Sequence, residues 1–295
     1  MLKLEQLAGL LEKNRAAGSA RVRNFSIGGK KFNFNSHPAV MGVVNLSADS
    51  WYRESVCLSA ETAVQRGMVL AAQGADIIDL GAESTLARAA RADESTQKAK
   101  LIPVVKQLRA ENILVSVETY SPKVTRATLE AGANILNLTG TEAAKEIFKI
   151  VAAHEAAVII CFVPGKNVRE AGEIDLNADP IPMLAEFFSR QIEIAQRNGV
   201  KNIFLDPGLG FYYRNLQDGA VRVRHQMNIF LNTFRLHALG FPVCHALPHA
   251  FEFFGEEVRC AEPFFAVLAA LGKTDLFRTH EVRRIKAVLD TLKAF

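Results

Sequence analysis

Short apolar runs alternate with longer amphipathic stretches along most of the chain. Each apolar run of roughly four to six residues is too short for a helix and suits a buried strand. These runs predict strands over residues 39–46, 76–80, 113–118, 135–138, 157–162, 203–206, 242–246 and 276–279.

Helix signals lie between the predicted strands. Ser59 is suited to cap a helix over 60–73 that Gly74 ends, and Ser121-Pro122 opens another over 123–131. Further helices are predicted from Asp179-Pro180 to about residue 199, and over 281–295 at the end of the chain.

Strand followed by helix, about eight times over some 250 residues, predicts an α/β fold of the (β/α)8 TIM barrel type. A doubly wound open sheet is the alternative, but no G-x-G-x-x-G follows the first strand. We expect one barrel domain over residues 38–295, since no linker-like segment divides it.

The first 37 residues fall outside this repeat. Residues 1–18 predict an amphipathic helix with leucines along one side. Val22, Phe25 and Ile27, then Phe32 and Phe34 after Gly28-Gly29, predict a β-hairpin. We expect helix and hairpin to form a separate N-terminal unit.

Composition limits the kind of partner. The 295 residues are 49% hydrophobic and 22% charged, with a formal net charge of +4. No basic stripe interleaved with aromatic residues is present, which argues against nucleic acid. The most basic short segment, 222–225, is predicted to be a solvated helix face.

The four cysteines are widely spaced and include no C-x-x-C pair. Cys161 and Cys244 lie in apolar runs and are predicted to be buried, which fits a reducing compartment. No run reaches the length of a membrane span, and the N-terminus lacks the apolar core of a secretory signal. We therefore expect a soluble cytoplasmic protein without a membrane partner.

Polar residues follow the predicted strands at their carboxyl ends, which meet at one mouth in a parallel barrel. The strand over 203–206 ends on Asp206, followed by the bare loop Pro207-Gly208. The other strand ends and loops supply Asn45, Ser84, Thr85, Glu118, Asn137, Arg278 and His280.

Carboxylates and amides in one ring suit a flat heterocycle that offers several N–H donors. Arg278 and His280 are suited to hold an anion such as phosphate, with hydroxyl or backbone donors from Ser84 and Thr85. Each residue taken alone also fits a simple turn-forming role. Because polar residues recur at the same position, the carboxyl end of one predicted strand after another, the pattern favours a binding site.

Five ordered motifs resemble the dihydropteroate synthase family, from about Pro38 to the C-terminus. They are Met41-Gly-Val-Val-Asn-Leu-Ser-Ala-Asp-Ser-Trp51, Ile77-Ile-Asp-Leu-Gly-Ala-Glu-Ser-Thr85, Val115-Ser-Val-Glu-Thr119, Leu205-Asp-Pro-Gly-Leu-Gly-Phe211 and Arg278-Thr-His-Glu-Val282. The resemblance implies a (β/α)8 barrel with a deep pterin pocket.

The family's reaction displaces diphosphate, with Mg²⁺ bound, from a pterin methylene by the amine of p-aminobenzoate. The resemblance carries the pterin contacts to Glu118 (in place of Asp), Asn137 and Asp206. It also implies that three residues bind the diphosphate and act in catalysis: Asn45, Arg278 and His280. Of these, Asn45 would also bind the metal. Weaker contacts to the diphosphate or second substrate would fall to Ser84, Thr85, Arg88 and His249.

Several family features are replaced. The loop R-P-G-A reads 86–89 Leu-Ala-Arg-Ala, and S-R-K after the seventh strand reads 247–250 Leu-Pro-His-Ala. G-F-G-K becomes 210–213 Gly-Phe-Tyr-Tyr, N-D becomes Asn137-Leu138, and M-H becomes Cys161-Phe162. The residues that the resemblance assigns to the pterin pocket are therefore retained in part, whereas those of the pocket mouth are replaced.

Three functions stay open. The first is a transferase of the dihydropteroate synthase type, with p-aminobenzoate or another second substrate. The others are a pterin-binding paralogue without turnover, and a pterin-dependent methyltransferase that works with a corrinoid partner. The pair Arg278 and His280 favours the first, because a methyltransferase has no diphosphate to hold.

Two further stretches bear on metal binding and on association. His245 and His249 would form a metal pair only in a helix, but they follow a strand and flank Pro248. The stretch 263–271 is apolar nearly all round, so it is either deeply buried or a subunit interface. With the resemblance, this favours a homodimer.

Overall fold

The computed structural model describes residues 2–50, 52–84, 91–170, 172–210, 213 and 215–294. Trp51, Thr85, Arg88 with the rest of the 86–89 loop, Phe211, Tyr212 and Phe295 lie outside the described residues.

Eight parallel strands form the barrel, as the sequence predicted. They are β3 (Ala39–Asn45), β4 (Ile77–Gly81), β5 (Val115–Thr119), β6 (Ile135–Leu138), β7 (Ala157–Cys161), β8 (Ile203–Asp206), β9 (Cys244–Ala246) and β10 (Leu276–Thr279). Their order in the sheet is β8-β7-β6-β5-β4-β3-β10-β9. A parallel bridge between Leu205 and Val243 joins the two edges, so the sheet closes on itself.

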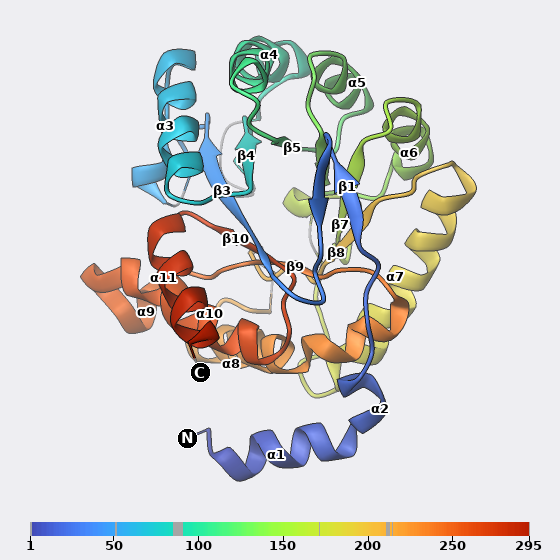
Figure 1. Ribbon diagram of the computed structural model, residues 1–295, viewed down its shortest axis with the longest axis vertical. Helices are drawn as coiled ribbons and strands as arrows, with labels where there is room; N and C mark the ends of the chain where they lie inside the picture. Colours follow the sequence, from blue (N-terminus) through green and yellow to red (C-terminus); the bar gives the residue numbers. More distant parts are fainter. Residues whose placement is uncertain are drawn as a thin grey trace.

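Helices surround the strands in chain order (Figure 1). They are α3 (Ala60–Ala72), α4 (Glu94–Ala110), α5 (Pro122–Glu130), α6 (Ala144–Ala153), α7 (Pro180–Arg197), α8 (Gly219–Asn232), α10 (Ala261–Leu271) and α11 (Val282–Lys293). Short helical segments are η1 (Arg53–Ser55), η2 (Val168–Glu170), η3 (Thr233–Leu239), α9 (Phe251–Phe254) and η4 (Gly255–Cys260).

The predicted caps hold the helices where the sequence placed them. Ser59 Oγ accepts the Thr62 N–H at the start of α3, and Ser121 Oγ accepts the Val124 N–H at the start of α5. Gly74 ends the α3 turn with a positive φ of 104°, which favours glycine. Helices α4, α6 and α8 had no named start signal in the sequence prediction.

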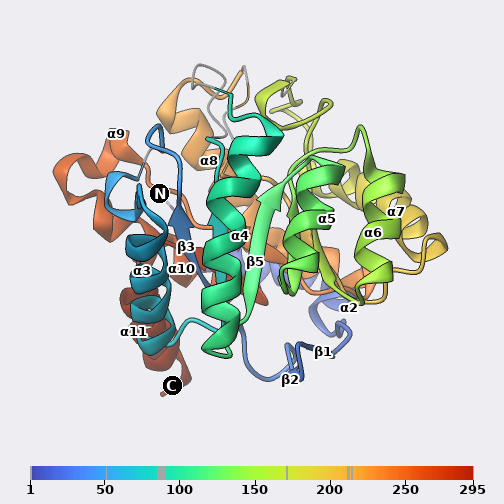
Figure 2. The same cartoon turned by 90° about the horizontal axis from the view of Figure 1, so that it is seen from above.

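The N-terminal segment comprises α1 (Leu4–Lys13), α2 (Arg15–Gly18) and the hairpin β1 (Phe25–Ile27) to β2 (Lys30–Phe32). Both turn glycines of the hairpin, Gly28 and Gly29, have positive φ, as a tight turn requires. Figure 2 shows the hairpin at the end of the barrel opposite the carboxyl ends of the strands.

Phenylalanines of the N-terminal segment close that end of the barrel. The Phe25 and Phe34 rings contact Phe204 of β8 edge-on, with centroid distances of 5.1 and 5.3 Å. They join the inward-facing residues of the strands in one buried cluster, separate from the larger core between strands and helices. Because these side chains fill the amino end of the barrel, the opening for a ligand lies at the carboxyl ends of the strands.

Candidate active site

A pocket lies at the carboxyl ends of the strands and collects residues from most of them. Its lining includes these predicted site residues: Asn45, Ser84, Glu118, Asn137, Asp206, His249, Arg278 and His280. The barrel thus brings together every predicted site residue that the structure describes.

Arg278 links two carboxylates at the floor of the pocket. Its Nε donates to Asp79 Oδ2 at 2.8 Å, and an Nη donates to Glu118 Oε2 at 2.6 Å. Asp79 is fully buried, and the Arg278 side chain is only 15% exposed. A buried charge needs partners, and this arginine balances two acids at once. The sequence predicts Arg278 as an anion holder, whereas the structure shows it bonded to these two acids.

Asn137 extends this network across the floor. Its Nδ2 donates to Asp79 Oδ2 at 3.2 Å, and its Oδ1 accepts from the Cys161 thiol at 3.2 Å. Asp206 is anchored by the Gly208 N–H at 2.7 Å. Gly208 has a φ of 77°, so the turn that supplies this donor favours glycine.

The floor carries more acid than base, and burial changes how it titrates. Burial raises the pKa of Glu118 to about 7, although Arg278 opposes the shift. Burial likewise raises the pKa of Asp206 to about 6. Near neutral pH, both protonation states of Glu118 are therefore populated: a carboxylate that only accepts hydrogen bonds, and a carboxylic acid that can also donate one.

Asn45 stands at the end of β3 with its amide orientation fixed. Its Nδ2 donates to Ser55 Oγ at 2.6 Å, and a Cβ on Gly81 would lie 3.6 Å from its Oδ1. Within the described part of the chain, no donor bonds to this Oδ1. Mg²⁺ prefers oxygen ligands and often takes one protein oxygen with phosphate oxygens and water. Asn45 fits that role.

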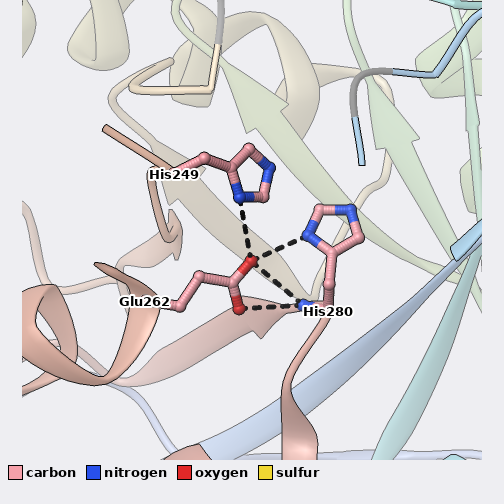
Figure 3. Close-up of side chains that lie close together, drawn as sticks. All are labelled: His249, Glu262 and His280. Carbon is pink, nitrogen blue, oxygen red and sulfur yellow. Dashed lines mark hydrogen bonds and ion pairs between the residues drawn. The ribbon is translucent and has the colours of Figure 1, made fainter. Parts of the chain in front are cut away.

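The mouth contains two histidines around a buried glutamate (Figure 3). Glu262 Oε1 lies 2.8 Å from His280 Nδ1 and 3.6 Å from His249 Nδ1. Burial lowers the pKa of His280 to about 3 and that of His249 to about 4. Both imidazoles are therefore neutral at pH 7 and bring no cationic charge to an anion.

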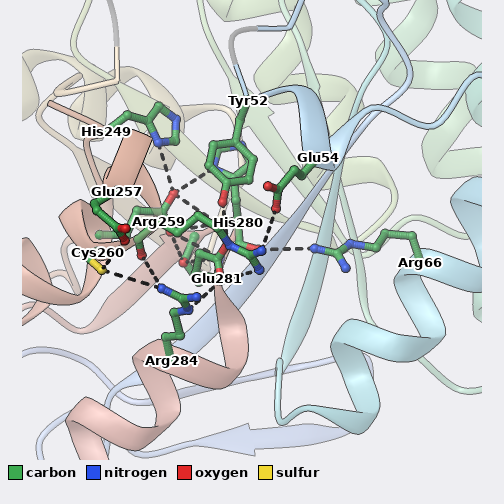
Figure 4. A network of polar contacts seen from close by, with 12 residues as sticks. Tyr52, Glu54, Arg66, His249, Glu257, Arg259, Cys260, His280, Glu281 and Arg284 are labelled. Carbon is green, nitrogen blue, oxygen red and sulfur yellow. Dashed lines mark hydrogen bonds and ion pairs between the residues drawn. The ribbon is translucent and has the colours of Figure 1, made fainter. Parts of the chain in front are cut away.

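Tyr52 lies against both imidazole rings. Its ring stacks on His249 and His280 with centroid distances of 4.9 and 4.7 Å. Its hydroxyl donates to Glu281, which Arg259 also holds at 2.8 Å (Figure 4). Burial, with the Glu281 charge, raises the pKa of Tyr52 well above its usual range, so the phenol stays neutral.

The loop after β4 is cross-braced. The Ser84 carbonyl accepts from Arg169 at 2.8 Å, and the Ser84 hydroxyl donates to the Asp49 carbonyl at 3.3 Å. Glu83 accepts from the Tyr120 hydroxyl at 2.8 Å. Thr85 and Arg88, predicted for the same wall, lie outside the described residues.

Comparison with known proteins agrees with this geometry. A family model described as pterin binding enzyme matches residues 41–246. The chain belongs to the pterin-binding enzyme family. A dihydropteroate synthase of Clostridium beijerinckii is 33% identical over 224 residues, covering 74% of this chain and 76% of that one. Another, from Synechocystis, is 28% identical and covers 89% and 91% of the two chains.

Solved structures of the same kind share the fold. Dihydropteroate synthase of Xanthomonas albilineans with 4-aminobenzoic acid matches with a TM-score of 0.78 at 28% identity, covering 92% of this chain and 97% of its own. The same enzyme in complex with 7,8-dihydropteroate matches with a TM-score of 0.72 at 25% identity and the same coverage.

Asp79 and Arg222, like Tyr52 and Glu262 at the mouth, were not predicted as site residues. Asp79 falls within the strand predicted over 76–80 and has no predicted role, although it joins Arg278 and Asn137. Arg222 was predicted to be solvated, and that was wrong. It is buried, lines the pocket, and donates to the Leu216 carbonyl at 3.1 Å and to Glu252.

His245 and His249 do not lie in the helix that a metal pair would have required. His245 is fully buried on β9, bonded to the Thr233 hydroxyl at 2.7 Å and packed edge-on against Phe230. His249 instead faces Glu262 from the loop after β9. An i, i+4 pair shares one face in a helix, but here His245 lies within β9 (Cys244–Ala246) and His249 lies in the loop beyond it.

Proposed function

We propose that the protein is a transferase of the dihydropteroate synthase type in folate-type pterin biosynthesis. It would join 6-hydroxymethyl-7,8-dihydropterin diphosphate to an arylamine, p-aminobenzoate or a different second substrate. The observation that carries this proposal is the buried cluster of Asp79, Glu118, Asn137, Asp206 and Arg278 below an open mouth.

The floor suits the heterocycle by its hydrogen-bonding capacity. A pterin presents several N–H donors along one edge, and Asp206 and Glu118 line the pocket as acceptors. Oδ1 of Asp79 is buried and has no hydrogen-bond partner among the described residues. A buried acceptor without a donor is costly, so a bound ligand or water that supplies one would stabilise the site.

The reaction would break the bond between the pterin methylene carbon and the diphosphate oxygen. The amine nitrogen would form the new C–N bond and lose a proton, and diphosphate would leave with its bonding electrons. Arg278, at the junction of floor and mouth, is the cation best placed to stabilise that charge. Mg²⁺ held through Asn45 would neutralise further charge on the diphosphate.

A binder without turnover is the second candidate. Among the pocket-lining residues that the structure describes, Arg222 and Arg278 are the cations and no lysine is present. Arg278 is already engaged by two acids. Losing a charged contact to a transferring group costs several kcal/mol of transition-state stabilisation, which would slow turnover while leaving binding intact. A methyltransferase is disfavoured, as it has no diphosphate for the mouth to hold.

Calorimetric titration with the pterin diphosphate, with and without Mg²⁺, tests the proposal. We expect binding by the wild type, and at least about a tenfold loss in Asp206→Asn, since a charged acceptor is removed from a buried site. Asp290→Asn, an exposed change on α11, is the matched control.

Diphosphate release then separates the two candidates. Release on adding p-aminobenzoate or another arylamine supports the transferase. Binding without release supports the second candidate, and no binding to either the diphosphate or the free pterin refutes both.

We also propose a cytoplasmic homodimer. Cys57, Cys161 and Cys244 are buried free thiols, and Cys260 is an exposed one, which suits a reducing compartment. Within the described residues, no helix has both the length and the apolarity for a bilayer crossing. Phe264, Val267 and Leu271 expose apolar surface on α10, which supports a subunit contact.

A further inference from the structure

We propose that His249, Glu262 and His280 bind one divalent transition-metal ion of the zinc class at the mouth of the pocket. Three separate elements supply the ligands. His249 comes from the loop after β9, Glu262 from the first turn of α10, and His280 from the end of β10. This site differs from the Mg²⁺ position proposed at Asn45 in both its residues and its ligand type.

The donor atoms are spaced for a shared ion. One donor atom from each residue lies within 4.8 Å of the other two. Ligands of a tetrahedral zinc ion, each about 2.1 Å from the metal, lie about 3.4 Å from one another. The distances from Glu262 Oε1 to the two Nδ1 atoms, 2.8 and 3.6 Å, fall on either side of that value.

The carboxylate of Glu262 is oriented so that one oxygen faces both rings. Oε2 accepts from the Thr279 hydroxyl and from the backbone N–H groups of His280 at 3.0 Å and Glu281 at 3.3 Å. Oε1 has a longer contact of 3.3 Å with the His280 N–H and is turned to the imidazoles. These donors hold Oε2 in place and leave Oε1 for a single metal bond.

His249 provides an independent sign of a missing partner. Its Nδ1 is buried, yet it makes no hydrogen bond within the described part of the chain. At 3.6 Å, its separation from Glu262 Oε1 is too long for a hydrogen bond. A metal ion between these atoms would satisfy the ring nitrogen, whereas the direct bond from His280 to Glu262 would not.

Tyr52 restricts the rings without blocking the metal position. It stacks on the faces of His249 and His280, with interplanar angles of 23° and 26°. A metal binds in the plane of an imidazole, at the nitrogen lone pair, so stacking on the face leaves that position accessible. The aromatic ring also excludes water from one side, which strengthens binding to neutral imidazoles.

Two imidazoles and one carboxylate are a donor set for Zn²⁺, Co²⁺, Ni²⁺, Fe²⁺ or Mn²⁺. Three protein ligands leave at least one coordination position, and both histidines line the pocket. That position suits an anionic oxygen. If the proposed transferase function holds, the diphosphate would meet a metal cation where the family's lysine is absent.

Metal binding to the full chain tests the proposal without any pterin. The protein is first stripped with a chelator and then titrated with Zn²⁺ against a chromophoric chelator, and with Co²⁺ followed by its visible absorption. We expect one ion per chain, and a loss of affinity of at least about 100-fold in His249→Ala and Glu262→Gln.

Matched controls locate the ion. His37→Ala removes an exposed histidine just before β3, at the opposite end of the barrel, and Cys260→Ser removes the exposed thiol. Both should bind like the wild type. Asp206→Asn should also keep the metal, so a failure of pterin binding stays distinct from a failure of this site.

Two results would overturn the proposal. One is a stripped wild-type protein that takes up neither ion at micromolar concentration, in which case Glu262 only orients His280. The other is unchanged affinity in a folded His249→Ala protein, which would place the ion elsewhere. His249 stacks on Tyr52 but lies 3.6 Å from Glu262 without a hydrogen bond, so its removal spares the buried hydrogen bonds of that carboxylate.

Discussion

Glu118 is a residue of the pocket floor whose pKa burial raises to about 7. The family pattern has an aspartate at this position, and the longer side chain here reaches Arg278 at 2.6 Å. One additional methylene moves a carboxylate by more than an ångström, and a packed pocket responds to such a change. A bound pterin would therefore face a side chain that is carboxylate in part of the molecules and carboxylic acid in the rest, placed differently from the family's aspartate.

This protonation predicts a pH dependence of stability. Burial raises the pKa of Glu118 from 4.5 to about 7, so the folded protein keeps a proton that the unfolded chain has released. The stability from this group is fully present below pH 4.5 and is lost as the pH rises through about 7. In Glu118→Gln, that fall should disappear. Urea unfolding of both proteins between about pH 5 and about pH 8 measures it.

Glutamine keeps an oxygen acceptor for Arg278, which limits any other effect of the change. The quantity to follow is the difference in unfolding free energy between variant and wild type. A difference that stays constant across this pH range would contradict the raised pKa. Asp290→Asn should show a constant difference, since Asp290 is exposed on α11.

Residue roles were only partly predictable from the sequence. Asn45, Asp206 and His280 follow strands, and the carboxyl ends of parallel strands converge, so their meeting was predicted. Arg222 lies on a helix between Val221 and Val223, in the basic segment 222–225, and nothing local shows that α8 turns it toward the pocket. Glu262 begins an apolar helix that was interpreted only as core or interface, so its contact with two histidines could not be found.

Helix α8 positions Arg222, and its N-cap is the element-scale feature to test. Asp218 Oδ1 accepts the Val221 N–H at 2.9 Å at the start of the helix. Asp218→Ala should lower the unfolding free energy by about 1 kcal/mol, because a capped N–H loses its partner. Urea unfolding checks this value, and pterin titration checks whether Arg222, one turn further along, is displaced.

Asp218→Asn is the matched variant, since asparagine caps a helix about as well as aspartate. It should unfold close to the wild type. Equal losses in the alanine and asparagine variants would show that the negative charge at the helix start matters, not the hydrogen bond.

At the same scale, elements with strong local signals were predicted best. The eight strands are short apolar runs bounded by turn residues, and each is present within a few residues of its predicted bounds. The seventh was placed from Pro242, but β9 begins at Cys244, because only the segment after Val243 pairs with β10. The contacts of His249 and His280 with Glu262 form between separate elements, and no periodicity of the sequence predicts such contacts.

The whole molecule uses its two ends differently. Phenylalanines of the N-terminal segment fill the amino end of the barrel, whereas the pocket lined by the predicted site residues lies at the carboxyl end. Helix α1, in contrast, buries no residue, and Leu4 is 78% exposed. The predicted amphipathic pattern therefore produces a helix here without a packed face inside the chain.

Helix α10 exposes the apolar face on which the proposed homodimer rests. Its residues Phe265, Leu268 and Ala269 are buried, while Phe264, Val267 and Leu271 are exposed on another face. One face of this stretch is therefore core, as one alternative predicted, and the other face is exposed and available for an interface. Large exposed apolar side chains in a row are uncommon on monomers and mark contact surfaces.

Phe264→Glu should convert the proposed dimer to monomers, because a charge would be buried in an apolar interface. Sedimentation velocity at micromolar concentration measures this directly. Leu4→Glu is the matched control, since it adds the same charge at an exposed apolar residue on α1 and should remain dimeric. A wild-type protein that sediments as a monomer would refute the dimer. A dimeric Phe264→Glu protein would move the interface to another face and leave the exposed side of α10 without a role in association.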